Sequence, residues 1–442
     1  MKIRIAFLGP YNNQGIGGGD RKFSIYYKNL HEDHFDKYFI YIVDDPTLIS
    51  THDHDAILLT EDKLLDFLAS ISMHYIYFAG AKISDATKEV LLKQYYGLIN
   101  VNFTTCYIDN KKLLNLIISK TDYRKIRFIN GPLTNSYVVY NPIDFENRVR
   151  LAKETHEDYR SHFTDKKYII GRLGRAEPSK WHFLMIASLL KLQRQGNYSY
   201  GFVFAGMPLL YRKTLKLLLN KKMYKNILFL PELRKLEDIA KFYRSIDVFR
   251  QTSWIGESFG NVIAEAFCFN VPVITDFKAF YRNGKVHKKL YDAQIELVDN
   301  EVNGGYCAYP DSFVKFLDNH TLEQLHHMGK AGYEKVKNVY NVKFTSNTMA
   351  KILYDFGRER LSFQHTDAFE KLVQIPGSEE VERYKGEYFR RMAECYRFNP
   401  ISSLKRYFYT IGANIWRSIE YGYLLYRKIL KSVLKIDIEK HI

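Results

Sequence analysis

The chain has 442 residues, a formal net charge of +16, and a composition that is 46% hydrophobic and 26% charged. These values exclude wholesale disorder and collagen-like low complexity, and the length predicts two or three domains. The positive charge favours an anionic partner: nucleic acid, anionic lipid or a phosphorylated small molecule. Four dispersed cysteines without a CxxC pair argue against a zinc knuckle and a disulfide framework, which fits a reducing cytosol.

The first 140 residues alternate short apolar segments with longer amphipathic ones. Residues 3–8 predict a first strand, which is followed by a glycine-rich turn and a helix from about Asp20. Ser84 is predicted to cap a helix that extends to Tyr96. The further strands predicted in this part cover residues 38–43, 56–59, 75–79 and 98–103. Such alternation implies a parallel sheet with helices on both faces.

The alternation then restarts. Residues 138–146 are interpreted as a strand broken by Asn-Pro and as an interdomain connector. Helices are expected from Lys180, over residues 236–245 and from about Phe259. Strands are expected at residues 168–175, 200–206, 226–233, 247–251 and 271–276. We therefore predict an α/β chain with two Rossmann-like parallel-sheet domains, at residues 1–140 and 141–345.

The remaining residues, 346–442, are predicted to form a helical extension without strands. Apolar residues recur mostly every three or four positions between 404 and 433, which predicts one helical stripe. Residues 401–442 also contain eight Lys or Arg, three Asp or Glu and seven aromatic residues. A basic amphipathic helix of this kind can lie on an anionic membrane surface, or it can pack against the rest of the protein or a second chain.

Three segments carry side chains or backbone suited to binding an anionic, hydroxyl-rich ligand. The first is the glycine-rich loop at residues 9–22, where Gly17, Gly18 and Gly19 lack a Cβ. Backbone can approach a ligand closely there, and the amides at the start of the following helix can bind an anion. The loop matches neither GxGxxG nor a P-loop, and the alternative interpretation is an ordinary surface turn.

The second segment is residues 174–180, in which Arg175 follows a predicted strand and Lys180 comes five residues later. A guanidinium fork and a compact ammonium group are suited to phosphate oxygens. Both would lie at the carboxyl end of a strand, where open α/β sheets bind ligands. The alternative is a pair of solvated surface cations.

The third segment, residues 257–265, places Glu257 before a predicted helix and Glu265 within its first turns. Carboxylates accept hydrogen bonds from sugar and ribose hydroxyls. The first helical amides, at Phe259, Gly260 and Asn261, can bind hydroxyls or phosphate. The alternative is a helix cap with one solvated glutamate.

In this order, the segments resemble the retaining glycosyltransferases of the GT-B fold, specifically glycosyltransferase family four and its glycogen-synthase-like relatives. The resemblance covers about residues 1–360, and its most specific part is E-x7-E followed by a Pro-Val strand. The matching motifs are GGGD at 17–20, YNPID at 140–144, GR-x4-K at 174–180, FAG at 204–206 and E-x7-E at 257–265. The departures are Trp181 and Asn270 where the family usually has glycine, and Asn141–Pro142 where it has Asn-Gly. Asn270 can still adopt a positive φ.

The resemblance implies two lobes facing across a cleft and assigns a role to each matching residue. Arg175 and Lys180 would hold the donor diphosphate and stabilise its charge as it leaves. Glu257 would contact hydroxyls of the donor sugar, and Glu265 would bind the ribose. Backbone contacts to sugar or phosphate would come from Phe259, Gly260 and Asn261, phosphate contacts from Gly18 and Gly19, and a contact near the base from Leu233.

The resemblance also implies that the leaving diphosphate takes the acceptor proton, so that neither a metal nor another cofactor is needed. One competing motif is the DHD of residues 53–55, which mimics a metal-binding DxD. It precedes its strand rather than ending it, and we interpret it as a polar turn.

The function expected is therefore a metal-independent retaining hexosyltransferase for surface glycan assembly. It would use a nucleotide-sugar donor and a saccharide or lipid-linked acceptor. Rival interpretations are a nucleotide-sugar epimerase on the same fold, a glycan-binding pseudoenzyme, and a nucleic-acid-binding protein driven by the net charge. No RNA-recognition or zinc-finger signature supports the last, so no nucleic acid is expected. The sequence has no long apolar run and no signal-peptide core, which predicts a cytoplasmic protein, either soluble or peripheral at a membrane.

Overall fold

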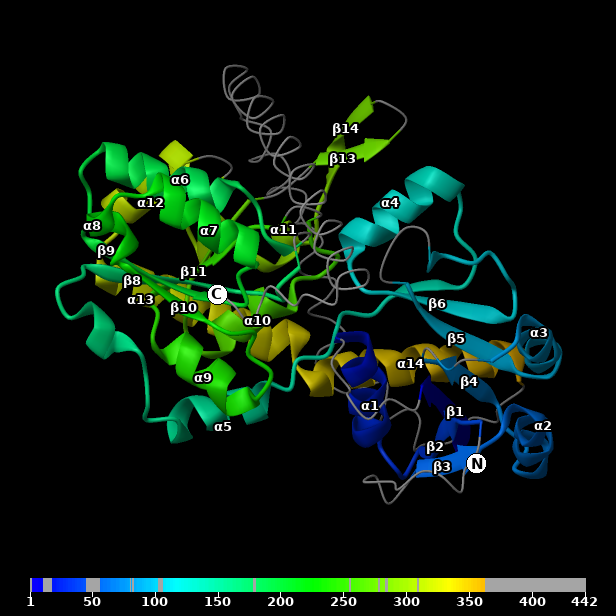
Figure 1. Ribbon diagram of the computed structural model, residues 1–442. Coiled ribbons are helices and arrows are strands. Elements are labelled where there is room, and N and C mark those ends of the chain that lie inside the picture. Colours follow the sequence, from blue (N-terminus) through cyan, green and yellow to red (C-terminus); the bar gives the residue numbers. More distant parts are fainter. Residues whose placement is uncertain are drawn as a thin grey trace, which may run out of the picture. The chain divides into compact units, whose positions relative to one another are not determined.

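The structure is a computed structural model of the chain (Figure 1). It describes residues 2–10, 18–44, 56–79, 81, 83–101, 106–177, 180–253, 256–276, 279–282, 285–307 and 310–361. The described residues form two compact units. The first comprises residues 2–146, 279–296 and 335–361, and the second comprises residues 147–276 and 297–334.

The first unit is built on a seven-stranded sheet in the order β3-β2-β1-β4-β5-β6-β7, with every neighbouring pair parallel. The order changes direction beside β1, as in a doubly wound fold. Its strands are β1 (Ile3–Pro10), β2 (Phe35–Ile42), β3 (Ala56–Leu59), β4 (Tyr75–Phe78), β5 (Tyr96–Val101), β6 (Leu113–Ile117) and β7 (Ser136–Val138). Its longer helices are α1 (Gly18–Asn29), α2 (Glu61–Ser70), α3 (Asp85–Gln94), α4 (Lys120–Asn130) and α14 (Val342–Arg360).

Strand β1 shows how the sequence produces helices on both faces of this sheet. Ile5 and Phe7 point to one face and pack with α1 and α14. Ala6 and Leu8 point to the other face and pack with α2 and α3. Because side chains alternate along a strand, a strand that is apolar at every position has two faces to cover.

Helix α14 comes from a part of the sequence far from the sheet that it covers. It packs beside α1 in the first unit, and Figure 1 shows it running along that sheet. Met349, Leu353 and Phe356 belong to the same buried cluster as Phe7 and Tyr75. The Tyr75 hydroxyl also donates a hydrogen bond to the Leu353 carbonyl, at 2.8 Å. The core of the first unit therefore depends on residues near position 350.

A further excursion of the chain also belongs to the first unit. It forms an antiparallel hairpin and a short helix, namely β13 (Ala279–Arg282), β14 (Lys285–Tyr291) and α11 (Gln294–Leu297). Glu296, on α11, lies at the amino end of α4. Its carboxylate accepts hydrogen bonds from the Thr121 amide at 2.6 Å, the Lys120 amide at 3.2 Å and the Tyr140 hydroxyl at 3.1 Å.

The second unit contains a six-stranded parallel sheet in the order β10-β9-β8-β11-β12-β15. Its strands are β8 (Tyr168–Leu173), β9 (Tyr200–Ala205), β10 (Ile227–Leu230), β11 (Val248–Gln251), β12 (Val273–Thr275) and β15 (Gly304–Tyr306). The helices wholly or mainly in this unit are α5 (Phe145–Glu154), α6 (Leu184–Arg194), α7 (Leu209–Leu218), α8 (Lys221–Tyr224), α9 (Leu236–Arg244), α10 (Asn261–Cys268), α12 (Pro310–Asn319) and α13 (Leu322–Lys335).

Two sets of helices cover this second sheet. Side chains of α6, α7 and α12 share one buried cluster with the sheet, to which Met185, Leu215 and Phe313 belong. On the opposite face, Phe242 of α9 packs edge-on against Phe249 and lies over Gly171. The predicted fold, two parallel Rossmann-like sheets in one chain, is thereby confirmed.

Several predicted element boundaries differ from the structure. Ser84 caps α3 as predicted, accepting a hydrogen bond from the Thr87 amide. The strand predicted at residues 138–146 is wrong, because β7 ends at Val138 and α5 begins at Phe145. Helix α6 begins at Leu184 rather than at Lys180, and strand β6 was not predicted.

The extension beyond residue 361 lies outside the described residues. Among the helices that the structure does describe, none is long and apolar enough to cross a membrane.

Candidate functional site

The candidate site lies where the strand order of the second sheet changes direction. The chain runs outward from β8 to β9 and β10, and then returns to β11 on the other side of β8. Loops that leave the carboxyl ends of two such strands diverge, and open α/β sheets bind ligands in the space between them. The loop after β8 contains Arg175 and Lys180, and the segment after β11 contains Glu257.

Lys180 and Glu257 meet at this point. The Lys180 Nζ lies 3.2 Å from Glu257 Oε2, and both side chains are mostly buried. The other carboxylate oxygen of Glu257 accepts a hydrogen bond from Gln251 Nε2, at 3.0 Å. Gln251 is the last residue of β11, so the rigid sheet fixes the carboxylate. The structure thus joins two sequence-predicted residues that are 77 positions apart.

Arg175 is more exposed than Lys180 and has a different partner. Its guanidinium pairs with Glu177 at 3.0 Å, and about half of its side chain is accessible. Its main-chain carbonyl accepts a hydrogen bond from the indole of Trp181, at 3.0 Å. The side chain of Arg175 is therefore accessible to a ligand, while its main-chain carbonyl is held by the Trp181 indole.

The loop after β8 also approaches the end of β9 closely. Gly206 follows β9 with φ +72°, and a Cβ there would lie only 2.0 Å from the Gly174 carbonyl oxygen. Only glycine fits this position, because both the backbone conformation and the space exclude a side chain. Gly206 is part of the FAG motif noted in the sequence.

Helix α10 begins directly beyond Glu257. Gly260 is its N-cap in the left-handed region, with φ 98°, and Asn261 is its first residue. The Phe259 side chain is buried. Because the first amides of a helix lack partners within the helix, this end carries partial positive charge beside Glu257. Asn270, after the helix, has φ 57°, which confirms that it adopts the conformation expected of the replaced glycine.

Glu265 has a different partner from Glu257. It lies on α10, where its Oε1 is 2.6 Å from Nη2 of Arg148, and both side chains are mostly buried. The two glutamates of the E-x7-E motif are thus held by separate cations, Glu257 by Lys180 and Glu265 by Arg148.

The remaining predicted residues lie in other positions. Gly18 and Gly19 are the first residues of α1 in the first unit. Leu233 lies in the loop after β10 and is partly exposed. Residues 53–55 lie outside the described residues. In the part of the chain that is described, no three His, Cys, Asp or Glu side chains are grouped as they would be around a metal ion.

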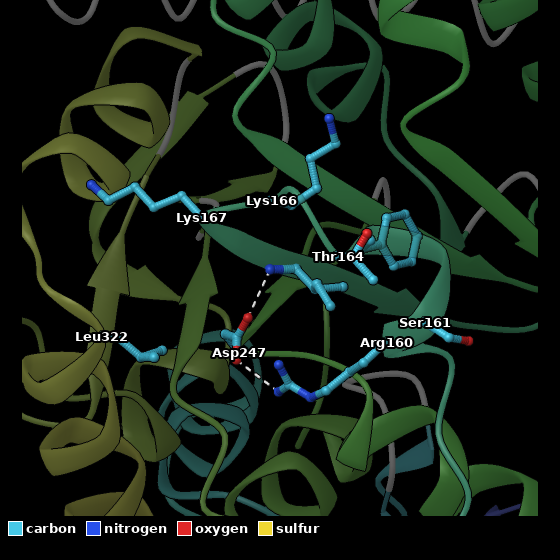
Figure 2. Close-up of a pocket in the computed structure, with 9 residues that line it drawn as sticks. Arg160, Ser161, Thr164, Lys166, Lys167, Asp247 and Leu322 are labelled. Carbon is cyan, nitrogen blue, oxygen red and sulfur yellow. Dashed lines mark hydrogen bonds and ion pairs between the residues drawn. The ribbon is translucent and has the colours of Figure 1, made fainter.

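A pocket of about 440 Å³ lies at the opposite edge of the second sheet (Figure 2). Lys166 and Lys167 precede β8 and Asp247 precedes β11, so this is the amino edge. Arg160 Nη2 donates a hydrogen bond to Asp247 Oδ1 at 2.7 Å, drawn as a dashed line in Figure 2, and Asp247 also accepts a hydrogen bond from the Ile169 amide. None of the sequence-predicted site residues lines this pocket.

The sequence interpretation missed Gln251, Arg148 and Arg172, which contact the predicted residues. Arg172 had a detectable signal, since a charged residue within the apolar run YIIGRL must be buried with its partners. No pattern in the sequence indicates the roles of Gln251 and Arg148, because their contacts with Glu257 and Glu265 depend on tertiary structure.

Part of the second unit matches a known protein family. Residues 154–280 match the family model described as glycosyl transferases group 1. The match covers β8 to β12 and includes Lys180, Glu257 and Glu265. Arg148, the partner of Glu265, lies just before the matched segment. No curated protein matches the chain significantly.

Solved structures share the fold at low sequence identity. An Anabaena protein, Alr3699/HepE in complex with UDP, is 16% identical, with a TM-score of 0.58 over 80% of this chain and 100% of that one. A glycosyltransferase from Rickettsia africae is 14% identical, with a TM-score of 0.59 over 80% and 98%. Sucrose-phosphate synthase from Thermosynechococcus elongatus is 13% identical, with a TM-score of 0.59 over 81% and 100%. These likenesses place the chain in the GT-B fold.

Proposed function

We propose that the protein is a retaining glycosyltransferase. It transfers a sugar from a nucleoside-diphosphate donor to a saccharide or lipid-linked saccharide acceptor. The observation that carries the proposal is the Lys180–Glu257 pair at the switch point of the second sheet, within the segment that matches glycosyl transferases group 1. A cation and a carboxylate held 3.2 Å apart supply one group for phosphate oxygens and one for sugar hydroxyls.

Each residue has a role that its surroundings support. Lys180 and the accessible guanidinium of Arg175 bind the donor diphosphate. Glu257, oriented by Gln251, accepts hydrogen bonds from donor sugar hydroxyls. Glu265 binds the ribose through Oε2, because Arg148 engages Oε1. The amino end of α10 adds backbone amides from Gly260 and Asn261.

The proposed reaction requires no protein nucleophile. The bond from the anomeric carbon to the diphosphate breaks, and a bond to the acceptor oxygen forms on the same face of the sugar. The acceptor proton passes to the departing diphosphate. The enzyme's contribution is to stabilise the negative charge that develops on the diphosphate, which fixed cations and helix amides can do without a metal. We propose that no metal is required, so activity should survive chelation of divalent cations by EDTA.

The acceptor and location are proposed from the sequence alone. The basic segment 401–442 is suited to an anionic membrane surface, where a lipid-linked saccharide would be presented. An epimerase on the same fold would instead consume donor without any acceptor. Acceptor-dependent release of nucleoside diphosphate therefore separates the two activities.

Lys180→Ala tests the proposal. The variant should lose about 100- to 1,000-fold in kcat, as expected when a group that stabilises transition-state charge is removed. Its melting temperature should fall far less in proportion than its turnover, because Gln251 still donates a hydrogen bond to the Glu257 carboxylate that loses its cation. A screen of UDP, GDP and ADP sugars by thermal shift identifies the donor first, since a ligand bound only by the native state raises the melting temperature.

Lys166→Ala is the matched control. Lys166 lies in the same unit, is mostly buried, and pairs with Asp165 at 2.9 Å, but it lies at the pocket on the amino edge (Figure 2). Equal losses of turnover in the two variants would contradict the role of Lys180. Absence of any effect of nucleotide sugars on the wild-type melting temperature would contradict the proposed function itself.

A further inference from the structure

Beneath the candidate site, a guanidinium is completely buried. Arg172 is the fifth residue of β8 and is 1% exposed. Burial lowers the pKa of its guanidinium to about 10, so the group remains charged at neutral pH. A buried charge is costly unless it is hydrogen-bonded, so its bonds indicate why it is there.

The bonds of Arg172 go to main-chain carbonyls on both sides of the switch point. Its Nη2 donates to the Lys180 carbonyl at 2.5 Å and to the Thr252 carbonyl at 3.1 Å. Its Nη1 donates to the Leu173 carbonyl. Thr252 directly follows β11, whose last residue, Gln251, orients Glu257. Arg172 thus connects the backbone that carries Lys180 to the end of the strand that orients its carboxylate partner.

Trp181 makes a similar contact to the backbone at Arg175, near the start of the same loop. Its ring is fully buried against Phe204, and the Arg172 guanidinium lies 5.1 Å from the ring centroid. Its indole N–H donates to the Arg175 carbonyl at 3.0 Å. These two neighbouring side chains therefore donate hydrogen bonds to the backbone of both predicted phosphate-binding residues, Trp181 to the Arg175 carbonyl and Arg172 to the Lys180 carbonyl.

We propose that Arg172 and Trp181 are positioning residues, which fasten the backbone at Arg175 and Lys180 so that these two cations are held where diphosphate charge develops. Neither side chain touches the ligand in this proposal. They act through the carbonyls of Arg175 and Lys180. This inference rests on the function proposed above, but the fastening itself can be tested without substrate.

Trp181→Phe is the sharpest variant, because it keeps an aromatic ring next to Arg172 and removes the indole N–H, although the smaller ring also leaves a cavity. We expect kcat to fall about tenfold and KM for the donor to rise by a smaller factor, since misplaced cations bind the diphosphate less well and stabilise its developing charge less well still. Arg172→Met removes the other fastening and should cost about 100-fold in kcat. If Arg172→Met fails to fold, Trp181→Phe still decides the question.

Tyr168→Phe is the control for loss of a buried hydrogen bond. The Tyr168 hydroxyl donates to the His320 carbonyl at 2.6 Å, at the amino end of the same strand β8. This variant should also lose stability, though less than Trp181→Phe because it leaves no large cavity, and it should keep the wild-type kcat. A kcat reduced equally in both variants would show that Trp181 has only a structural role, and would overturn the inference.

Amide hydrogen exchange gives the readout that is independent of activity. In the ligand-free protein, exchange at the amides of residues 174–177 and of Lys180 should accelerate at least tenfold in Trp181→Phe and stay at the wild-type rate in Tyr168→Phe. Unchanged exchange in Trp181→Phe overturns the fastening whatever the enzyme does. Wild-type protein that consumes no nucleotide sugar overturns the proposed function, and the exchange result still decides whether Arg172 and Trp181 hold the loop.

Discussion

Lys22 is a buried lysine whose ammonium has no hydrogen-bond partner among the described residues. It lies on α1, is 2% exposed, and has the Tyr26 ring 5.8 Å away. Burial lowers the pKa of Lys22 from 10.5 to about 7. Unfolding at neutral to alkaline pH therefore takes up a proton, because the exposed lysine is charged while the folded one is neutral.

This difference in pKa makes stability depend on pH with a definite sign. Between about pH 7 and 10.5 the unfolded chain binds more protons at Lys22 than the folded chain, so the free energy of unfolding rises with pH. The slope from this one group approaches about 1.4 kcal/mol per pH unit. Below pH 7 the folded protein carries the full cost of a buried ammonium.

Lys22→Met should therefore stabilise the protein at pH 6.5, and its advantage over wild type should shrink as the pH rises to 9.5. Denaturant unfolding of both proteins at the two pH values measures this. Lys28→Met is the control, because Lys28 lies on the same helix but is exposed. An advantage that is the same at both pH values would contradict the assigned ionisation.

Among the elements, helix α4 has an unusual amino terminus. Ser119 caps it by accepting from the Asp122 amide, and Glu296 accepts from the amides of Lys120 and Thr121. The carboxylate belongs to α11, far away in the sequence, so it joins the excursion at residues 279–296 to the first unit. A negative charge at this end also interacts favourably with the helix dipole.

Glu296→Ala should cost about 3 kcal/mol of stability, because it leaves two buried amides and the Tyr140 hydroxyl without their acceptor. Glu296→Gln should cost less, since its amide oxygen can still accept. Thermal unfolding of the two variants gives the comparison. A loss below about 0.5 kcal/mol in Glu296→Ala would mean that the carboxylate contributes little to holding α11 against α4.

How far the sequence predicts the elements depends on how local their signals are. Strand β1 and helix α9 were found because an apolar run and an amphipathic period specify them within a few residues. Strand β6 was missed although Asp109 and Asn110, residue types typical of turns, stand just before its apolar run LLNLI. The supposed strand before Phe145 failed because its apolar residues pack as a connector and the first turn of α5.

For the candidate site too, the features with local sequence signals were predicted and those that depend on tertiary packing were not. The positions of Lys180 and Glu257 at two strand ends followed from strand–helix alternation, because parallel strands place their carboxyl ends at one edge. The partners of the two glutamates did not follow. Which cation reaches Glu265 depends on where α5 lies against α10, and no local pattern in the sequence specifies that packing.

At the scale of the whole molecule, the first unit is discontinuous in sequence. Its sheet is complete by residue 138, but its buried face needs Met349, Leu353 and Phe356 of α14. Without α14, an apolar surface that includes parts of Phe7 and Tyr75 would be exposed to water.

A fragment of residues 1–146 should therefore fail to unfold cooperatively and should bind a hydrophobic dye such as ANS. Joining residues 335–361 to that fragment through a flexible linker should restore a sharp thermal transition and reduce dye binding. Calorimetry and ANS fluorescence of the two fragments make the comparison. A cooperative transition in the shorter fragment would show that α14 is not needed to close the core.

The late position of α14 has a consequence for biosynthesis. The ribosome makes α14 only after translating all of the second unit's described residues, which takes about 10 to 40 seconds at ordinary elongation rates. During that interval one face of the first sheet is covered by α1 but not yet by α14, so part of its apolar surface remains exposed. The second unit can thus finish folding before the first one. The first unit starts to be synthesised earlier, but its core is completed only when α14 packs against it.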